Sequence, residues 1–284
     1  MNRRVIYQGG GQLLLAVTVV GGLILSFGTR ALAPMPHYFS NDTTIENWVL
    51  AAQKIPALAP IPIPSPAPAS TPTSVSAAKY PSHMVMATVF YIGEGASQAN
   101  AGISNATTEW DSNPVGRFGG IDNPRSRKAD GTPLFKPKHN PYYVALPASE
   151  FSDTGPIAAA RKSSLWAAEA KGLGEEKSLF KGRWVKVSKG SKVVYGQWLD
   201  TGPSDDPSAT QDYGYVFGDS KVKPKNTFGL KAGIDLSPSM AFTLSLGSNL
   251  NEASGMVNWS FVDAASVPAG NWKNFAPVNN QTYW

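Results

Sequence analysis

The chain is 284 residues long, and only 16% of its side chains are charged. It contains no cysteine, which excludes disulfides, thiolate catalysis and cysteine-ligated metals. The formal net charge of +5 at pH 7 is not concentrated in a basic stripe, so the composition argues against a nucleic-acid partner.

The N-terminus has the pattern of an export signal. Arg3-Arg4 precedes an uncharged apolar run at 13–27, which is short for a membrane span unless it extends over 9–29. Residues 1–33 are therefore predicted to be a signal peptide or, if uncleaved, a membrane anchor. Either outcome places the protein outside the cytoplasm, in the periplasm, the cell envelope or the extracellular space.

A short helix and a linker are predicted over residues 34–82. Thr43 to Glu46 has the spacing of a capping box, which favours a short helix that ends near Lys54. Residues 55–75 are rich in proline, alanine, serine and threonine, the composition of an extended, semi-rigid spacer. Such a spacer implies a target at some distance from the membrane.

The body, residues 83–275, is predicted to be mainly β, in keeping with 27 glycines and 23 prolines in the chain. Helices are expected at 157–171 and from Pro238 to Leu246, and residues 276–284 are expected to be a tail. The strands indicate a small barrel of mixed topology with long loop insertions. They are predicted from period-2 alternation and turn signals at 84–92, 142–146, 184–187, 192–200, 232–236 and 255–262.

One strand of this body ends in a carboxylate. The alternating run up to Asp200 is stopped by Gly202-Pro203, so Asp200 is held at a strand end, a rigid position from which catalytic side chains are often presented. The spacing alone favours an aspartate that only caps a turn.

Three segments together resemble a known superfamily. They are 87–93, 197–203 and 232–238, and their order is similar to that of the double-psi β-barrel proteins: rare lipoprotein A, expansins, barwin and the family 45 endoglucanases. In rare lipoprotein A an Asp-Arg-Gly-Pro strand end is followed by Ile-Asp-Leu-Ser, and here Asp200-Thr-Gly-Pro and Ile234-Asp-Leu-Ser stand in that order. The resemblance covers about 84–263, with insertions at 96–138 and 204–230. It implies a six-stranded double-psi β-barrel.

The resemblance also implies roles for the carboxylates. Asp200 would be the general acid that protonates the glycosidic oxygen, and Asp235 would be structural, at the start of a helix. An inverting hydrolase needs a second carboxylate about 6.5–9.5 Å away. The endoglucanase position falls near Glu94, which is the candidate base, with Glu109 and Asp111 as alternates. A solvated loop carboxylate is an equally good interpretation of Glu94.

Aromatic rings are the candidates for stacking on sugars. Trp198 lies two residues before Asp200 and is therefore expected on the same face, and Tyr91, Tyr143 and Trp110 are further candidates. Strand positions such as that of Tyr143 are also typical of barrel core. Other rings of the insertions and the strands next to them are Phe118, Tyr142, Tyr213, Tyr215 and Phe217.

No metal site and no cofactor is expected. The three histidines are scattered, and Asp205-Asp206 with Asp212 is typical of a solvated loop, because no calcium-loop pattern is present.

Two functions remain open from the sequence. The first is an enzyme, a lytic transglycosylase or glycosidase that acts on peptidoglycan or another cell-wall glycan with Asp200 as the acid. The second is a non-catalytic, expansin-like module that binds and loosens wall polysaccharide. Two features favour this alternative: Thr201 stands where the family has arginine, and expansins keep the barrel and the Asp but lack a second carboxylate. A third hypothesis is a barrel that inhibits proteases or docks partners, since a fold does not fix a function.

Overall fold

The computed structural model describes residues 79–97, 100, 102–204 and 210–284. The predictions for the export segment, the linker and the Asp205-Asp206 pair fall outside these residues. Within the described ranges, none of the helices has both the length and the hydrophobicity that crossing a membrane requires.

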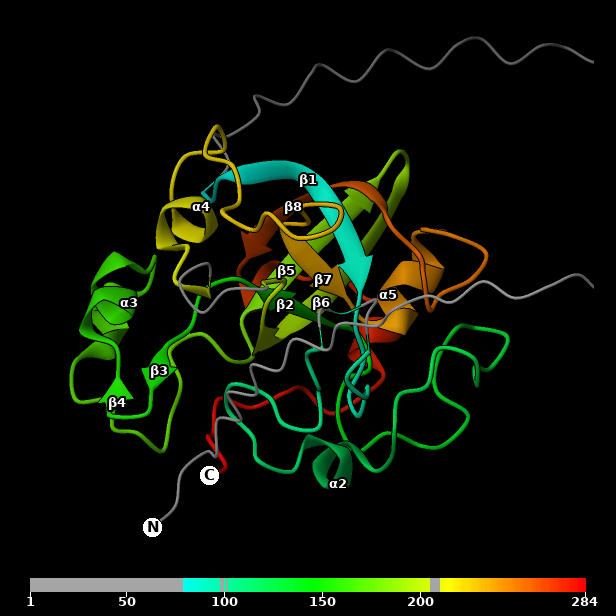
Figure 1. The fold of residues 1–284 in the computed structure, drawn as a ribbon, viewed down its shortest axis with the longest axis horizontal. Coiled ribbons are helices and arrows are strands. Elements are labelled where there is room, and N and C mark those ends of the chain that lie inside the picture. Colours follow the sequence, from blue (N-terminus) through cyan, green and yellow to red (C-terminus); the bar gives the residue numbers. More distant parts are fainter. Residues whose placement is uncertain (1–78, 98–99, 101, 205–209) are drawn as a thin grey trace, which may run out of the picture. The chain divides into compact units, whose positions relative to one another are not determined.

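Six strands form a closed barrel (Figure 1). Around the barrel the order is β1, β7, β2, β6, β5, β8, with β8 pairing again with β1. The pairs β1–β7 and β2–β6 are parallel and the other four are antiparallel. The prediction of a mainly β, six-stranded mixed barrel is confirmed, with strands at Ser82–Val89 (β1), Tyr143–Leu146 (β2), Trp184–Lys189 (β5), Lys192–Thr201 (β6), Ile234–Leu236 (β7) and Gly255–Val262 (β8).

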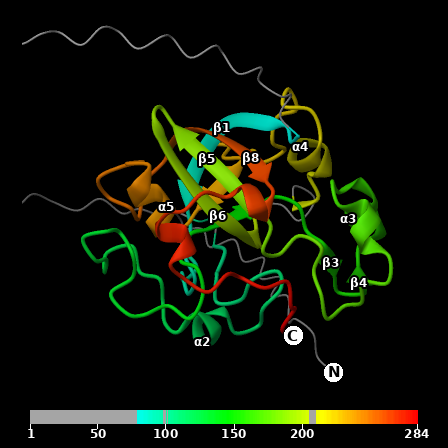
Figure 2. The same ribbon diagram turned by 180° about the vertical axis from the view of Figure 1, so that it is seen from behind.

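Short elements flank the barrel. Figures 1 and 2 show α3 and the β3–β4 hairpin on one side and α5 on the other. Their bounds are Pro114–Phe118 (α2), Phe151–Ser152 (β3), Gly155–Pro156 (β4), Ala158–Ser163 (α3), Ala167–Ala170 (η2), Tyr213–Phe217 (α4), Pro238–Thr243 (α5), Ala264–Ser266 (η4) and Asn271–Lys273 (η5).

The helix predicted at 157–171 is interrupted. Ser164 has an extended backbone, with φ −72° and ψ 154°, and its hydroxyl accepts a hydrogen bond from the Trp166 N–H at 3.2 Å. A serine that bonds to nearby backbone in this way competes with the helical ladder. The break turns the Trp166 ring into the core, where it meets Phe261.

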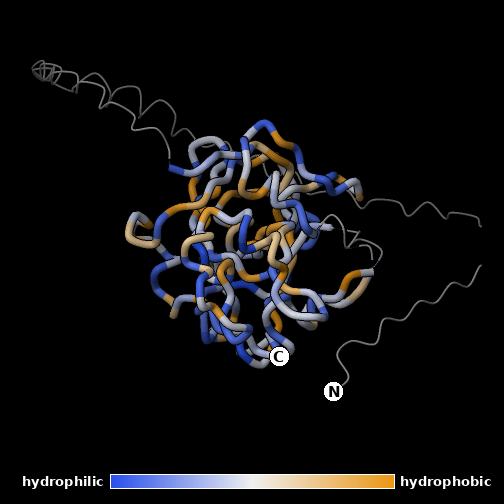
Figure 3. Tube along the Cα trace, turned by 90° about the vertical axis from the view of Figure 1, so that its left-hand side faces the viewer, coloured by the Kyte–Doolittle hydropathy of each residue, from blue (hydrophilic) through white to orange (hydrophobic). Residues whose placement is uncertain are grey.

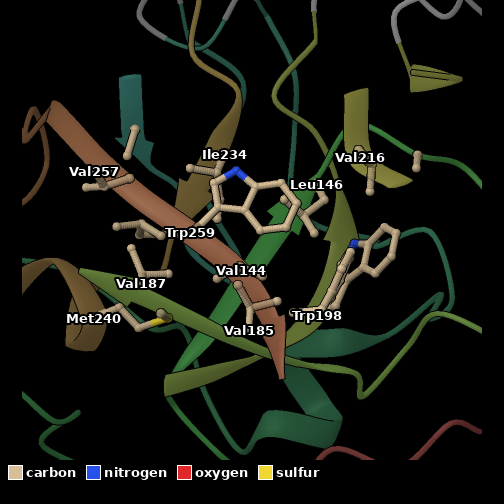
Figure 4. Packing of buried hydrophobic residues seen from close by; sticks show 14 of the residues in the cluster. Val144, Leu146, Val185, Val187, Trp198, Val216, Ile234, Met240, Val257 and Trp259 are labelled. Atoms are coloured by element: carbon tan, nitrogen blue, oxygen red, sulfur yellow. The ribbon is translucent and has the colours of Figure 1, made fainter. Parts of the chain in front are cut away.

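The barrel interior is a dense hydrophobic core. Hydrophobic segments cross the middle of the domain (Figure 3), and alternate residues of each strand meet there. Burying one such side chain stabilises the fold by ~1.5–3 kcal/mol. Figure 4 labels part of this core: Val144, Leu146, Val185, Val187, Trp198, Val216, Ile234, Met240, Val257 and Trp259.

A glycine lets helix α5 close one part of the core. Met240 projects from α5 onto β6 at Gly196, where a Cβ atom would lie 2.4 Å from the Met240 sulfur. Any larger residue at 196 would therefore displace the methionine.

A second hydrophobic cluster covers the outer face of β2 and β6. The end of the chain is fastened to it, because the Val278 N–H donates to Gln197 Oε1 at 2.9 Å and Gln197 Nε2 donates to the Val278 carbonyl at 3.0 Å. The residues expected to form a tail thus pack on the barrel wall. The members of the cluster are Phe90, Ile92, Phe118, Tyr143, Ala145, Leu199 and Val278.

Candidate functional site

A β-bulge near the end of β6 decides where Asp200 points. Val144 of β2 pairs with Trp198, and the next residue, Ala145, pairs with Asp200, so Leu199 is an extra residue in the ladder. Trp198 faces the interior, whereas Asp200 faces outward on the same side as Ala145. The expectation that Trp198 and Asp200 share a face is wrong, because the bulge breaks the two-residue period between them.

The same alanine joins Asp200 to a second carboxyl. Ala145 pairs with Asp200 on one side and with Asp235 of β7 on the other, and Asp235 pairs with Thr88 of β1. Directly opposed residues in a sheet present their side chains to one face. Asp200 and Asp235, which we call the carboxyl pair, therefore lie in one row across the outer face of the barrel.

The small side chains of this row leave room between the two carboxyls. A Cβ atom placed on Gly202 would lie 3.7 Å from Asp235 Oδ2 and 3.9 Å from the Ala145 Cβ. Asp235 therefore reaches across Ala145 toward the end of β6, where Asp200 lies.

Asp200 is a carboxyl with raised proton affinity. Its side chain is buried, at 5% exposure. Oδ1 accepts hydrogen bonds from the backbone N–H of Glu109 at 2.7 Å and of Thr201 at 2.8 Å. Burial raises the pKa of Asp200 to about 7, and the negative charges of Glu109 and Asp235 add to the rise against the two hydrogen bonds. The group therefore holds a proton for much of the time at neutral pH.

Asp235 has a similar electrostatic environment. Burial raises the pKa of Asp235 to about 7, with the Glu94 charge adding to the rise and a hydrogen bond from the Thr88 hydroxyl opposing it. The expected role at a helix start is wrong. Ser237 caps α5, with its hydroxyl accepting from the Met240 N–H at 3.3 Å.

Of the other candidate carboxylates, Glu94 and Glu109 lie near the carboxyl pair, and Asp111 does not. Glu94 is half-buried, accepts from Asn105 Nδ2 at 2.9 Å, and burial raises its pKa. Its charge acts on Asp235, whereas Glu109 acts on Asp200. Asp111 is turned away and pairs with Arg117 Nε at 2.9 Å.

The Glu109 carboxylate is held by a loop. It accepts from the Ser149 hydroxyl at 3.0 Å and from the backbone N–H groups of Glu150 at 3.2 Å and Phe151 at 2.9 Å. The Glu109 backbone thus lies over Asp200, and the hydrogen bonds of the Glu109 side chain to residues 149–151 hold that backbone in place.

Most of the expected sugar-stacking rings lie in the core. Trp198 has no exposed surface and stacks on Phe180, with ring centroids 4.9 Å apart and an interplanar angle of 8°. Trp110 and Tyr143 are equally buried, and the Tyr143 hydroxyl donates to Asp122 Oδ2 at 2.7 Å. The structure therefore places these three rings out of reach of a ligand. Of the four candidates, Tyr91 is half-buried.

The remaining rings of the insertions follow the same pattern. Tyr213 is half-buried and donates to the Ser149 carbonyl at 2.9 Å. Asp212, expected in a solvated acidic loop, is buried and accepts from the Lys225 N–H at 2.7 Å. The buried rings are Phe118, Tyr142, Tyr215 and Phe217.

Sequence reasoning missed a buried ion pair beside this site. Asp122 has no exposed surface, binds Arg127 and accepts the Tyr143 hydroxyl bond. Arg127 Nη2 in turn donates to Ser239 Oγ at 2.5 Å, which ties the insertion to α5. Asp122 and Arg127 lie five residues apart in one insertion, but no local pattern marks them as buried, because Tyr143 and Ser239, which bind them, come from distant segments.

In the part of the chain that the structure describes, no three His, Cys, Asp or Glu side chains are arranged to hold a metal ion. No family model matches this sequence, and no curated protein matches it either. The function must therefore be argued from the site itself.

Proposed function

We propose that this chain is a double-psi β-barrel protein that cleaves a cell-wall glycan such as peptidoglycan. Asp200 is its general acid, in the manner of a lytic transglycosylase or a glycosidase. The N-terminal segment delivers the domain to the cell envelope. The observation that carries the proposal is the outward-facing carboxyl pair, in which burial raises the pKa of Asp200 to about 7.

The chemistry requires an acid that is still protonated near neutral pH. Proton transfer to the leaving oxygen lowers the barrier to breaking a glycosidic bond, and efficiency is highest when the pKa lies near the working pH. A carboxyl with a pKa of about 7 meets this condition, whereas one with the ordinary value of 3.8 does not.

We assign the second carboxyl to Asp235 in place of Glu94. Asp200 and Asp235 are separated by one strand, so their Cα atoms lie about 10 Å apart, twice the ~4.8 Å strand spacing. Two side chains that lean toward each other from this separation suit the carboxyl distances of about 5–9.5 Å that glycosidases use. Glu94 lies in the loop after β1, outside the row, and its charge only adds to the raised pKa of Asp235.

The replacement of arginine by Thr201 supports an acid. A guanidinium next to Asp200 would stabilise its charged form and lower the pKa. Thr201 carries no charge, and its hydroxyl has no hydrogen-bond partner among the described residues. The residue that departs from the family pattern thus adds no positive charge that would lower the pKa of Asp200.

The test is glycan cleavage by the full-length protein and its variants. Asp200→Asn should lower the release of soluble fragments from purified peptidoglycan by about 10²–10⁴-fold, the usual contribution of a general acid. Asp153→Asn, at an exposed loop position, is the matched control and should cleave like the wild type. Cleavage by Asp200→Asn at the wild-type rate would exclude Asp200 as the acid.

The non-catalytic, expansin-like function is favoured by one observation. Asp200 is only 5% exposed, and the Glu109 backbone lies over it, so a polymer reaches the carboxyl only if that segment moves. This alternative predicts that the wild-type protein binds insoluble wall glycan and releases no fragments from it.

A further inference from the structure

A cavity of about 620 Å³ lies on the other side of the segment that covers Asp200. Its walls come from residues 108–117, 138–139 and 276–283, together with Lys181 and Leu199. Two lining residues join it to the surroundings of Asp200, because Leu199 precedes Asp200 and Thr108 precedes Glu109, whose backbone covers Asp200.

The cavity walls carry an excess of positive charge. Lys181 is buried, at 5% exposure, and its Nζ donates one hydrogen bond, to the Gln281 carbonyl at 2.6 Å. Its other two N–H bonds have no acceptor among the residues that the structure describes. Lys138 and Arg117 also line the cavity, against Asp111 as the carboxylate. Three cations and one carboxylate leave an excess of two positive charges.

A tyrosine holds two of these cations in place. The Arg117 guanidinium lies 3.7 Å from the centroid of the Tyr283 ring, and Lys181 Nζ lies 4.6 Å from the same centroid. Arg117 is also held by Asp111 through Nε, which leaves its terminal nitrogens without an acceptor in the described ranges. Two cations that have N–H groups without an acceptor in the described ranges therefore line one cavity.

Buried polar atoms without partners point to a ligand. Thr108 is 6% exposed, and its Oγ1 has no hydrogen-bond partner among the described residues. His139 Nδ1 is likewise a buried atom without a hydrogen-bond partner in the described ranges. Both residues line the cavity. An unsatisfied buried polar group costs about 1–3 kcal/mol, so such groups call for an explanation in a folded protein.

The size and the apolar part of the wall indicate an organic ligand. A volume of about 620 Å³ falls within the range of small-molecule sites and exceeds the needs of an inorganic ion. Leu199, Pro277 and Val278 provide apolar surface beside the cations. Asp111 in the same wall disfavours a doubly charged anion, which favours a carboxylate over a phosphate.

We propose that this cavity binds the carboxylate of an acidic sugar unit, with Lys181 and Arg117 pairing with the anion and the Thr108 hydroxyl donating to it. The carboxylate rests on the cavity alone, whereas the sugar rests on the proposed glycan-cleaving function. The site would select glycans that carry an acidic group next to the bond at Asp200.

The first test is calorimetric titration of the full-length protein at pH 7 with glucuronate, its neutral methyl ester and inorganic phosphate. Glucuronate should bind at least tenfold more tightly than the ester or phosphate. Equal binding of glucuronate and the ester, or no binding of glucuronate, overturns the proposal. Phosphate binding as tight as that of glucuronate overturns the assignment to a sugar acid.

The second test uses variants. Thr108→Val removes a hydroxyl that has no partner in the described structure, so it should leave the melting temperature unchanged or higher while weakening glucuronate binding about fivefold. Lys181→Met should weaken it more than tenfold, and Lys186→Met, on the exposed side of β5, is the charge-matched control. Wild-type affinity in both Thr108→Val and Lys181→Met overturns the proposal.

The tests can contradict the anion site and the proposed glycan-cleaving function independently of each other. Glucuronate binding by a protein that cleaves no glycan contradicts the enzymatic function and leaves the anion site standing. Cleavage of glycan without glucuronate binding contradicts the anion site alone.

Discussion

The carboxyl pair and the cavity lined by Lys181 and Arg117 meet at Leu199, which lines the cavity and precedes Asp200. Burial shifts the pKa values of their charged groups in opposite directions. At the carboxyl pair, desolvation raises the pKa of Asp200 to about 7, so the acid holds its proton. In the cavity, desolvation lowers the pKa of Lys181 to about 8, so the base is closer to losing its proton. One cause, the removal of water from a charge, brings an acid and a base toward neutral pH from opposite sides.

The two regions also differ in how they are built. Asp200 and Asp235 stand on barrel strands, in register through Ala145. The cavity is assembled from an insertion, a loop and the end of the chain, with Tyr283 between its cations. A site on paired strands keeps its geometry as long as the barrel is folded, whereas a site on loops depends on contacts such as that between Lys181 and Gln281.

The largest expected effect on stability is that of Asp200→Asn at high pH. The folded-state pKa lies above the unfolded value of 3.8, so the unfolded chain loses the proton first, and wild-type stability falls as pH rises from about 4 to 7. The variant lacks this penalty and should be more stable than the wild type by up to about 4 kcal/mol at pH 8, at about 1.4 kcal/mol per pKa unit. Urea unfolding at pH 4 and pH 8 measures the difference, which should shrink to less than about 1 kcal/mol at pH 4.

Lys181→Met should show the opposite pH dependence. The folded-state pKa of Lys181 lies below its ordinary value of 10.5, so the folded protein loses this proton first and wild-type stability rises from about pH 8 to 10.5. After allowance for the lost bond to Gln281, the variant should be about 2 kcal/mol more stable at pH 7. Urea unfolding across this range should show the advantage shrinking by pH 10. An advantage that grows with pH would mean that the cavity does not desolvate the lysine.

Asp235→Asn tests the link within the carboxyl pair. Removing the neighbouring negative charge should lower the pKa of Asp200, by less than the rise that burial causes. The Asp200 carboxyl carbon, followed by NMR during a pH titration, reports this shift directly. An unchanged midpoint would show that the two carboxyls do not interact.

The smallest effect is expected for Thr88→Val. The Thr88 hydroxyl donates to Asp235 and holds down the pKa of that carboxyl, so its loss should raise the Asp235 pKa further. The same NMR titration of Asp235 measures it, with Thr154→Val, at an exposed loop position, as the control. A downward shift would contradict the assigned donor.

The strands could be predicted because their signal is local. Alternation and turn residues predict all six to within a few residues, and Gly202-Pro203 marks the strand end at which Asp200 stands. The bulge at Leu199 could not be predicted, since a bulge depends on register with another strand and its residues carry no distinctive type. That single residue reversed the orientation expected for Trp198.

The sequence by itself therefore determined a mainly β body, the positions of its strands and the residue at which the candidate acid stands, since these depend on neighbours along the chain. The tertiary structure alone decided that Asp235 and Asp200 are both in register with Ala145, that most candidate rings are buried, and that Lys181, Arg117 and Tyr283 meet in one cavity. These features arise between segments far apart in the sequence. Burial and pairing, which set the charges of both sites, exist only once the barrel has closed.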